Sequence, residues 1–186
     1  VRFYQNCYLF KAKEDSREEW GRILHAASDA LMSGGGIGVD YSILRHRGAL
    51  LSRTGGVASG PLHLAYSINE MGRNVQQGGS RRSAIYGSIN WLHKDAPEWL
   101  GAKDWANLNV PGAGGLTYAQ LKDSNFDAHA PLDFTNISLN YDDDFLGAIV
   151  SGNTYDLADI DEEIAHDPDV WGEIVKYATL PSTYVR

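Results

Sequence analysis

The chain has 186 residues, a formal net charge of −8 and a single cysteine. Its length is that of one domain with a sizeable core, and its apolar share of 43% is ordinary for a globular protein. One cysteine excludes an internal disulfide and a cysteine-rich zinc site, and no apolar run approaches the ~20 residues of a membrane helix. No signal peptide is visible, so we expect a cytoplasmic protein without a membrane partner, and the net acidity argues against nucleic acid as a partner.

The first forty residues predict a strand, a helix and a short extended piece. Residues 3–10 are rich in aromatics and predict the strand. Ser16 and Glu19 then fit a Ser-x-x-Glu capping box, and apolar residues follow at helical spacing. The helix is expected to end at Ser33 because three glycines come next, and residues 37–41 form the extended piece.

The rest of the chain predicts a further alternation of helices and strands. A long loop rich in Gly, Arg and Ser is expected over residues 42–60, and Pro61 suits the first turn of a second helix. The later predictions are a strand at 83–91, a short helix near 97–105, a glycine-rich turn at 111–115, a strand at 131–141 and a helix opened by the acids at 142–144. This alternation indicates an α/β fold whose three strands are too few for a closed sheet.

Charge is unevenly distributed along the chain. Residues 43–82 hold six arginines and one acid, and most of the glycines lie in or beside this stretch. Residues 140–186 hold eleven acids and two bases. Arginine combined with glycine suits anion binding, because guanidinium and backbone N–H groups can both approach phosphate. The alternative is that the arginines are solvated surface charges and the glycines are turns.

Six segments in order resemble the catalytic subunit of ribonucleotide reductase, over roughly residues 3–146. They are residues 5–9, 15–16, 35–39, 53–61, 77–84 and 131–138. The Thr-Gly-Gly-Val-Ala-Ser-Gly-Pro and Gln-Gly-Gly-Ser-Arg-Arg-Ser-Ala segments are most similar to the adenosylcobalamin-dependent branch. The resemblance therefore implies adenosylcobalamin as cofactor, although no cobalamin ligand is identifiable in the chain.

The resemblance implies part of a ten-stranded α/β barrel, namely its first strands and its two dimer-interface helices. We expect residues 1–146 to form the N-terminal part of that barrel and residues 147–186 to form an acidic helical tail. Helices over residues 16–33 and 61–75 would supply the four-helix bundle of a homodimer.

The resemblance also implies a binding site for a deoxynucleoside triphosphate (dNTP) effector, which selects the base that is reduced. Asp15 and Ser16 would hold its sugar and base, although Asp15 could instead be a plain helix-start acid. Residues 42–60 would form the first specificity loop, with Arg53 on the phosphates and Gly48, Thr54, Gly55 and Gly56 shaping it. Residues 76–84 would form the second specificity loop, in which Gln77 and Arg81 communicate with the base beside Gly78, Gly79, Ser80 and Arg82.

Cys7 has two interpretations. A lone cysteine on an apolar strand is most simply a small buried core residue. The resemblance instead implies one of the two thiols that reduce the substrate and become a disulfide, which a thioredoxin-like dithiol partner then resets. Asn6 beside it is a weaker candidate for contact with the ribonucleotide substrate. The six histidines show no metal-ligand spacing, and no metal site is expected.

The departures from the family pattern leave three interpretations open. No cysteine follows Cys7, so the radical-bearing cysteine of the family has no counterpart in this sequence. We expect the N-terminal portion of a catalytic domain, either a shortened piece or one product of a split gene whose partner polypeptide supplies the rest of the barrel. The first function is part of a ribonucleotide reductase that is inactive by itself. The alternative is a non-catalytic module that binds dNTP and dimerises, and an unrelated α/β domain with glycine loops is the third interpretation.

Overall fold

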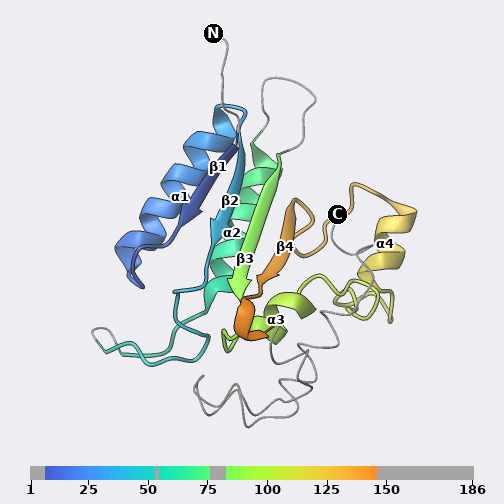
Figure 1. The fold of residues 1–186 in the computed structure, drawn as a ribbon. Helices are drawn as coiled ribbons and strands as arrows, with labels where there is room; N and C mark the ends of the chain where they lie inside the picture. Colours follow the sequence, from blue (N-terminus) through green and yellow to red (C-terminus); the bar gives the residue numbers. More distant parts are fainter. Residues whose placement is uncertain (1–6, 53–54, 76–82, 146–186) are drawn as a thin grey trace.

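Four parallel strands form one sheet at the centre of the computed structural model, which describes residues 7–52, 55–75 and 83–145 (Figure 1). The strands lie in chain order across the sheet and are β1 (Cys7–Lys11), β2 (Gly36–Asp40), β3 (Ile85–Asn90) and β4 (Thr135–Asn140). Parallel neighbours need a crossover connection, and the two long helices provide the first two crossovers. The α/β class predicted from the alternation of elements is therefore confirmed.

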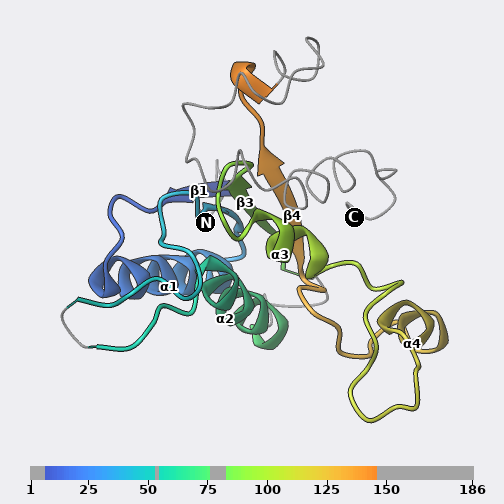
Figure 2. The same ribbon diagram turned by 90° about the horizontal axis from the view of Figure 1, so that it is seen from below.

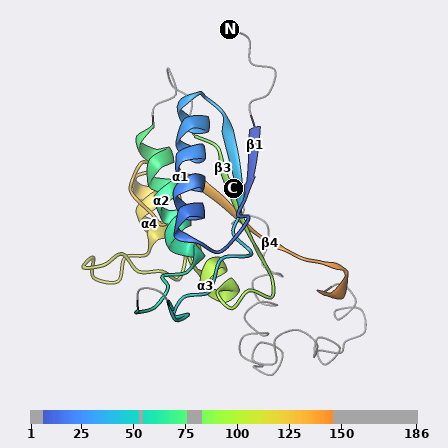
Figure 3. The ribbon, with the colours of Figure 1, turned by 90° about the vertical axis from the view of Figure 1, so that its left-hand side faces the viewer.

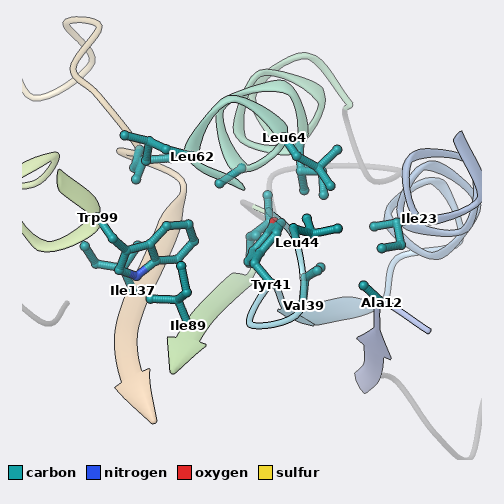
Figure 4. Close-up of a cluster of buried hydrophobic side chains, with 14 of the residues drawn as sticks. Ala12, Ile23, Val39, Tyr41, Leu44, Leu62, Leu64, Ile89, Trp99 and Ile137 are labelled. Carbon is teal, nitrogen blue, oxygen red and sulfur yellow. The ribbon is translucent and has the colours of Figure 1, made fainter. Parts of the chain in front are cut away.

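Both long helices, α1 (Arg17–Met32) and α2 (Pro61–Asn74), cover the same face of the sheet (Figures 2 and 3). They pack against each other and run in the same direction, because each leads from the end of one parallel strand to the start of the next. The core lies between them and the sheet, with Ile23, Leu64 and Val39 toward one end of the cluster and Ile137 beside Trp99 at the other (Figure 4). Each of these side chains is buried, which is the main source of stability in a layer of this kind.

The strands alternate between a buried face and a polar face. Phe10, Val39 and Ile137 occupy one row of the sheet and point toward the helices, together with Gly87. The next row along the strands lies on the opposite face and holds Lys11, Asp40, Ser88 and Ser138. The sheet therefore has one apolar side, which the helices cover, and one side rich in polar groups.

Two short helices complete the described part of the chain, α3 (Ala96–Gly101) after β3 and α4 (Tyr118–Ser124) before β4. The sequence predicted α3 but missed α4, whose signal is a Thr117–Gln120 capping box rather than an apolar stripe. None of the α4 residues is buried, so periodicity could not reveal it. No helix among residues 7–52, 55–75 and 83–145 combines the length and hydrophobicity needed to cross a membrane.

Several predicted elements need correction. The extended piece at residues 37–41 is β2, a central strand paired on both sides, so the sheet has four strands instead of three. Loop 42–60 is also more regular than expected, because Leu50 and Val57 form an antiparallel bridge within it. The predicted helical tail over residues 147–186 lies outside the described residues.

Candidate functional site

A cavity of about 520 Å³ lies where β1 leads into α1 and loop 42–60 follows β2. This is the edge at which the parallel strands end, the usual place for a ligand site in a parallel α/β sheet. Its size is in the range of small-molecule pockets. Its lining residues are Asp15, Ser16, Arg17, Glu18, Trp20, Arg45, Leu51, Ser52, Val57, Ala58, Ser59 and Gly60. The two predicted effector-binding residues at the start of α1 are thus brought together with the first predicted specificity loop.

Asp15 is bound to an arginine of that loop. Arg45 Nε donates to Asp15 Oδ2 at 2.5 Å, and Arg45 Nη2 donates to the Asp15 backbone carbonyl at 3.2 Å. The Asp15 side chain is 29% exposed and the Arg45 side chain is 36% exposed, so both remain accessible from the cavity. A carboxylate and a guanidinium therefore lie side by side in the pocket wall, where they can bind hydroxyl or amide donors and an anion respectively.

Ser16 is the N-cap residue of α1, as the sequence predicted. Its Oγ accepts a hydrogen bond from Glu19 N at 3.1 Å. The reciprocal half of the capping box is absent, because Glu19 Oε1 accepts from Lys13 N at 2.7 Å instead. Glu19 also accepts hydrogen bonds from the Arg22 side chain. These bonds, and to a smaller extent the bond from the Lys13 amide, lower the pKa of Glu19 to about 2. The start of α1 is thereby fixed beneath the pocket.

Loop 42–60 folds back on itself to form the outer wall of the pocket. Ala58 N donates to Ala49 O at 2.8 Å, and Gly48 N donates to Ala58 O at 2.9 Å. At its tip, Gly55 and Gly56 have φ angles of 68° and 87°, a left-handed conformation that glycine adopts without strain. Gly55 and Gly56 of the first predicted specificity loop thus form its turn, and their part in effector binding stays a prediction.

Three arginines of the basic stretch fall within the described residues, and each contacts a carboxylate. Arg45 binds Asp15, Arg47 Nη1 donates to Glu98 Oε1 at 2.8 Å, and Arg73 pairs with Glu70 and Asp133. Of these three, Arg45 lines the cavity. Arg45 belongs to the basic stretch predicted from the sequence, but a partner thirty residues away leaves no local signal that would distinguish it from the other arginines.

Part of the predicted site cannot be located. Asn6, Arg53, Thr54, Gln77, Gly78, Gly79, Ser80, Arg81 and Arg82 lie outside the described residues. The described residues on either side of residues 76–82 are Val75 and Ser83, which follow α2 and precede β3. Val75 and Ser83 therefore lie near the amino edge of β3, opposite the edge that holds the cavity.

Cys7 is exposed, so its interpretation as a buried core residue is wrong. It pairs in register with Gly36 at the amino end of β1 and, by alternation, lies on the same side of the sheet as Leu9 and Lys11. That side also holds the polar row of Asp40 and Ser88. The cysteine is thus separated from the cavity by the length of β1, and it faces away from the helices.

Metal ligation has no support within the part of the chain that the structure describes. No group of three or more His, Cys, Asp or Glu side chains there could hold a metal ion. Four of the described histidines already contact protein groups: His25 with Asp29, His46 with Arg47, His93 with Leu44 and His129 with Glu70.

Comparison with known proteins decides the family. A model of the family described as "Ribonucleotide reductase, barrel domain" matches residues 5–184 of the chain. The chain belongs to this family. The predicted resemblance and the partial-barrel fold are therefore confirmed, and the four parallel strands form part of a ribonucleotide reductase barrel.

Named relatives agree with this assignment. The chain is 32% identical over 125 residues to the vitamin B12-dependent ribonucleoside-diphosphate reductase of Thermoplasma acidophilum, covering 67% of this chain and 13% of that protein. It is 29% identical over 169 residues to the vitamin B12-dependent ribonucleotide reductase of Rhodopirellula baltica, covering 87% of this chain and 16% of that protein. The alignments thus span only a small part of these relatives.

The fold is also similar to that of a solved ribonucleotide reductase. The class Id ribonucleotide reductase alpha subunit of Actinobacillus ureae matches with a TM-score of 0.57 and 16% identity, over 95% of this chain and 26% of that chain. At this identity the likeness concerns the fold.

Proposed function

We propose that this ribonucleotide reductase barrel segment binds a dNTP effector in the cavity between the start of α1 and loop 42–60. The observation that carries the proposal is the joint position of Asp15, Ser16 and Arg45 in one cavity wall. Carboxylate and hydroxyl groups can recognise sugar and base donors, and an arginine fork suits phosphate oxygens. Arg53 from the same loop is proposed as a second phosphate ligand.

We further propose that a homodimer completes this site. Trp20, Leu24 and Met32 are half-buried or exposed apolar residues on one ridge of α1, and the small residue Ser28 occupies the position between Leu24 and Met32. A ridge of residues four positions apart is the feature that packs one helix against another. An antiparallel pairing of α1 and α2 with those of a second copy would set the end of the partner's α2 beside the start of α1. Residues 76–82, which follow α2, would then approach the cavity from the second copy.

In the complete enzyme, we propose that the barrel reduces ribonucleotides to deoxyribonucleotides and that Cys7 is one of the two thiols that act on the substrate. Loss of the ribose 2′-hydroxyl as water takes two electrons, which two thiols supply as they join in a disulfide. The exposed position of Cys7 on the polar side of the sheet supports this role. Its single occurrence means that the second thiol and the radical cysteine come from another part of the enzyme. A thioredoxin-like dithiol would then reduce the disulfide by exchange.

Adenosylcobalamin is the proposed radical source, because the relatives named above are vitamin B12-dependent. When bound, this cofactor supplies the radical that starts the reduction. The roles that we propose for this chain are effector binding and one substrate-facing thiol, and its own residues carry both.

A non-catalytic dNTP-binding module is the second candidate, favoured by the single cysteine. Two measurements separate the candidates and test the site. Isothermal titration of the chain with each of the four dNTPs is expected to give one saturable site per chain, with weaker binding of the matching ribonucleotides. A turnover assay on the chain alone is expected to give no product, and product on addition of a polypeptide that supplies the rest of the barrel supports the reductase. Absence of dNTP binding by the folded chain would overturn the effector site.

A further inference from the structure

The turn between β3 and α3 holds loop 42–60 near both of its ends (Figure 1). At the start of the loop, His93 Nε2 lies 2.6 Å from Leu44 O, and Asp95 Oδ2 accepts a hydrogen bond from Arg47 N at 2.8 Å. At the end of the loop, a Cβ atom on Gly60 would lie 2.6 Å from the same Asp95 oxygen. One short turn is thus in contact with residues at both ends of the loop that walls the cavity.

The hydrogen bonds of this turn define the form of His93. Asp95 N donates to His93 Nδ1 at 3.0 Å, so Nδ1 is an acceptor and carries no proton. Nε2 therefore carries the proton and donates it to the Leu44 carbonyl. In this tautomer the imidazole accepts a hydrogen bond from Asp95 N and donates one to Leu44 O. A proton on Nδ1 as well would make two N–H donors face each other.

Asp95 is buried, with 7% of its surface exposed, although it carries a carboxylate. A buried carboxylate is costly unless hydrogen bonds satisfy it, and the Arg47 amide provides one. Gly60 has a φ of 82° and can lie against Asp95 because it has no side chain. The position of Gly60 in the cavity wall therefore depends on the position of Asp95.

The same turn is attached to the end of β3. Leu92 N donates to Asn90 Oδ1 at 2.8 Å, and His93 N donates to Asn90 O at 3.0 Å. By alternation Asn90 belongs to the polar side of the sheet, with Ser88. The turn that contacts loop 42–60 is therefore also hydrogen-bonded to a residue on that side of the sheet.

We propose that His93 and Asp95 are positioning residues of the nucleotide pocket, which fix both ends of loop 42–60 and couple its conformation to the carboxyl end of β3. This inference rests on the proposed dNTP site, but the hold on the loop exists without nucleotide. Neither residue lines the cavity, so neither needs to touch the ligand. Their effect on binding comes from the loop geometry that they maintain.

The test compares Asp95→Ala with Asp95→Asn, whose amide oxygen can still accept the Arg47 N–H. Hydrogen exchange of the Arg47 amide in the nucleotide-free chain is expected to accelerate at least tenfold in Asp95→Ala, while amides of β2 keep their rates. Affinity for dNTP is expected to fall about tenfold, and Asp95→Asn is expected to recover most of both losses. Glu98→Gln is the matched control, because it removes only the carboxylate charge beside the Arg47 guanidinium and leaves the Arg47 amide bond to Asp95 unchanged.

His93→Ala provides an independent variant in case Asp95→Ala does not fold. It is expected to accelerate exchange of the Asp95 amide, which has lost its acceptor, and to weaken dNTP binding. Unchanged exchange and unchanged affinity in a folded variant would overturn the positioning role. If the unaltered chain binds no dNTP, the effector site itself is refuted, and the exchange rates of Arg47 and Asp95 still decide whether the turn holds the loop.

Discussion

Arg45 and Asp15 join loop 42–60 to the start of α1 through two hydrogen bonds, one to the carboxylate and one to the backbone carbonyl. The pair spans thirty residues of sequence and lies in the wall of the cavity. It sets an arginine, suited to phosphate, next to a carboxylate, suited to sugar or base donors. The proposed binding of a nucleotide depends on these two adjacent charged side chains.

Substitutions of the pair should weaken nucleotide binding more than they weaken the fold. Asp15→Asn and Arg45→Gln are each expected to lower dNTP affinity about tenfold or more, because each removes a charged group from the cavity wall. A partly exposed ion pair contributes little to stability, so the free energy of unfolding should change by less than about 1 kcal/mol. Calorimetric titration and urea denaturation measure the two quantities.

Asp29→Asn is the matched control for these variants, since Asp29 lies at the far end of α1 and its side chain is 62% exposed. It should bind dNTP with unchanged affinity. Equal losses in all three variants would show that the effect comes from helix α1 in general rather than from the pocket.

The proposed dimer makes a prediction about the ridge of α1 that Trp20, Leu24, Ser28 and Met32 form. Ser28→Glu places a charged and larger side chain between Leu24 and Met32, and it is expected to shift the chain from dimer to monomer in sedimentation equilibrium. His25→Glu is the control, because the His25 side chain is 81% exposed on the same helix and lies outside the ridge. A monomeric chain before any substitution, or a dimer that tolerates Ser28→Glu, would contradict the proposed interface.

Gly87 is expected to tolerate no side chain. A Cβ atom there would lie 3.1 Å from ring atoms of both Trp99 and Tyr41, which are fully buried. Gly87→Ala should therefore lower the free energy of unfolding by about 1–3 kcal/mol, the usual cost of overpacking a core. Gly21→Ala should instead raise it by up to about 1 kcal/mol, because Gly21 is on a helix with no atom within 4 Å of the added methyl group. Urea denaturation of both variants checks the contrast.

Stability should depend on pH through Glu19. Its pKa is about 2 in the folded chain, below its ordinary value of 4.5, because the Arg22 side chain and the Lys13 amide bind the charged form. The unfolded chain therefore binds more protons in this range, and folding loses the contribution of Glu19 as the pH falls from about 5 toward 2. Glu19→Gln should flatten the stability curve over this window, as measured by denaturation at each pH. Parallel curves for the two proteins would refute the assignment.

The sequence predicted the elements with strong local signals and missed those that depend on distant partners. Ser16 marks the start of α1 correctly, and Pro61 marks the start of α2, because capping and proline preferences act over one helical turn. The sequence predicts only a short extended piece where β2 lies, because two glycines interrupt its apolar pattern and its stability comes from β1 and β3 on either side. Arg45 was not singled out for the same reason, since its partner Asp15 is close only in the fold.

The exposure of Cys7 likewise depends on distant parts of the fold, and here the local sequence pattern indicates burial where the structure shows an exposed residue. A lone cysteine on an apolar strand suggested a buried core residue, yet alternation along β1 directs it to the side of the sheet that the helices leave uncovered. Which face of a strand is buried depends on where the helices pack, and a short strand does not reveal this by itself. The exposed thiol is compatible with the role that the family resemblance implies.

The most direct test of the proposed effector site is a crystal structure of the chain with a dNTP bound. The nucleotide is expected in the cavity between the start of α1 and loop 42–60, with its phosphates against Arg45 and its sugar or base against Asp15 and Ser16. A nucleotide bound elsewhere on the chain, with this cavity unchanged, would contradict the proposed function.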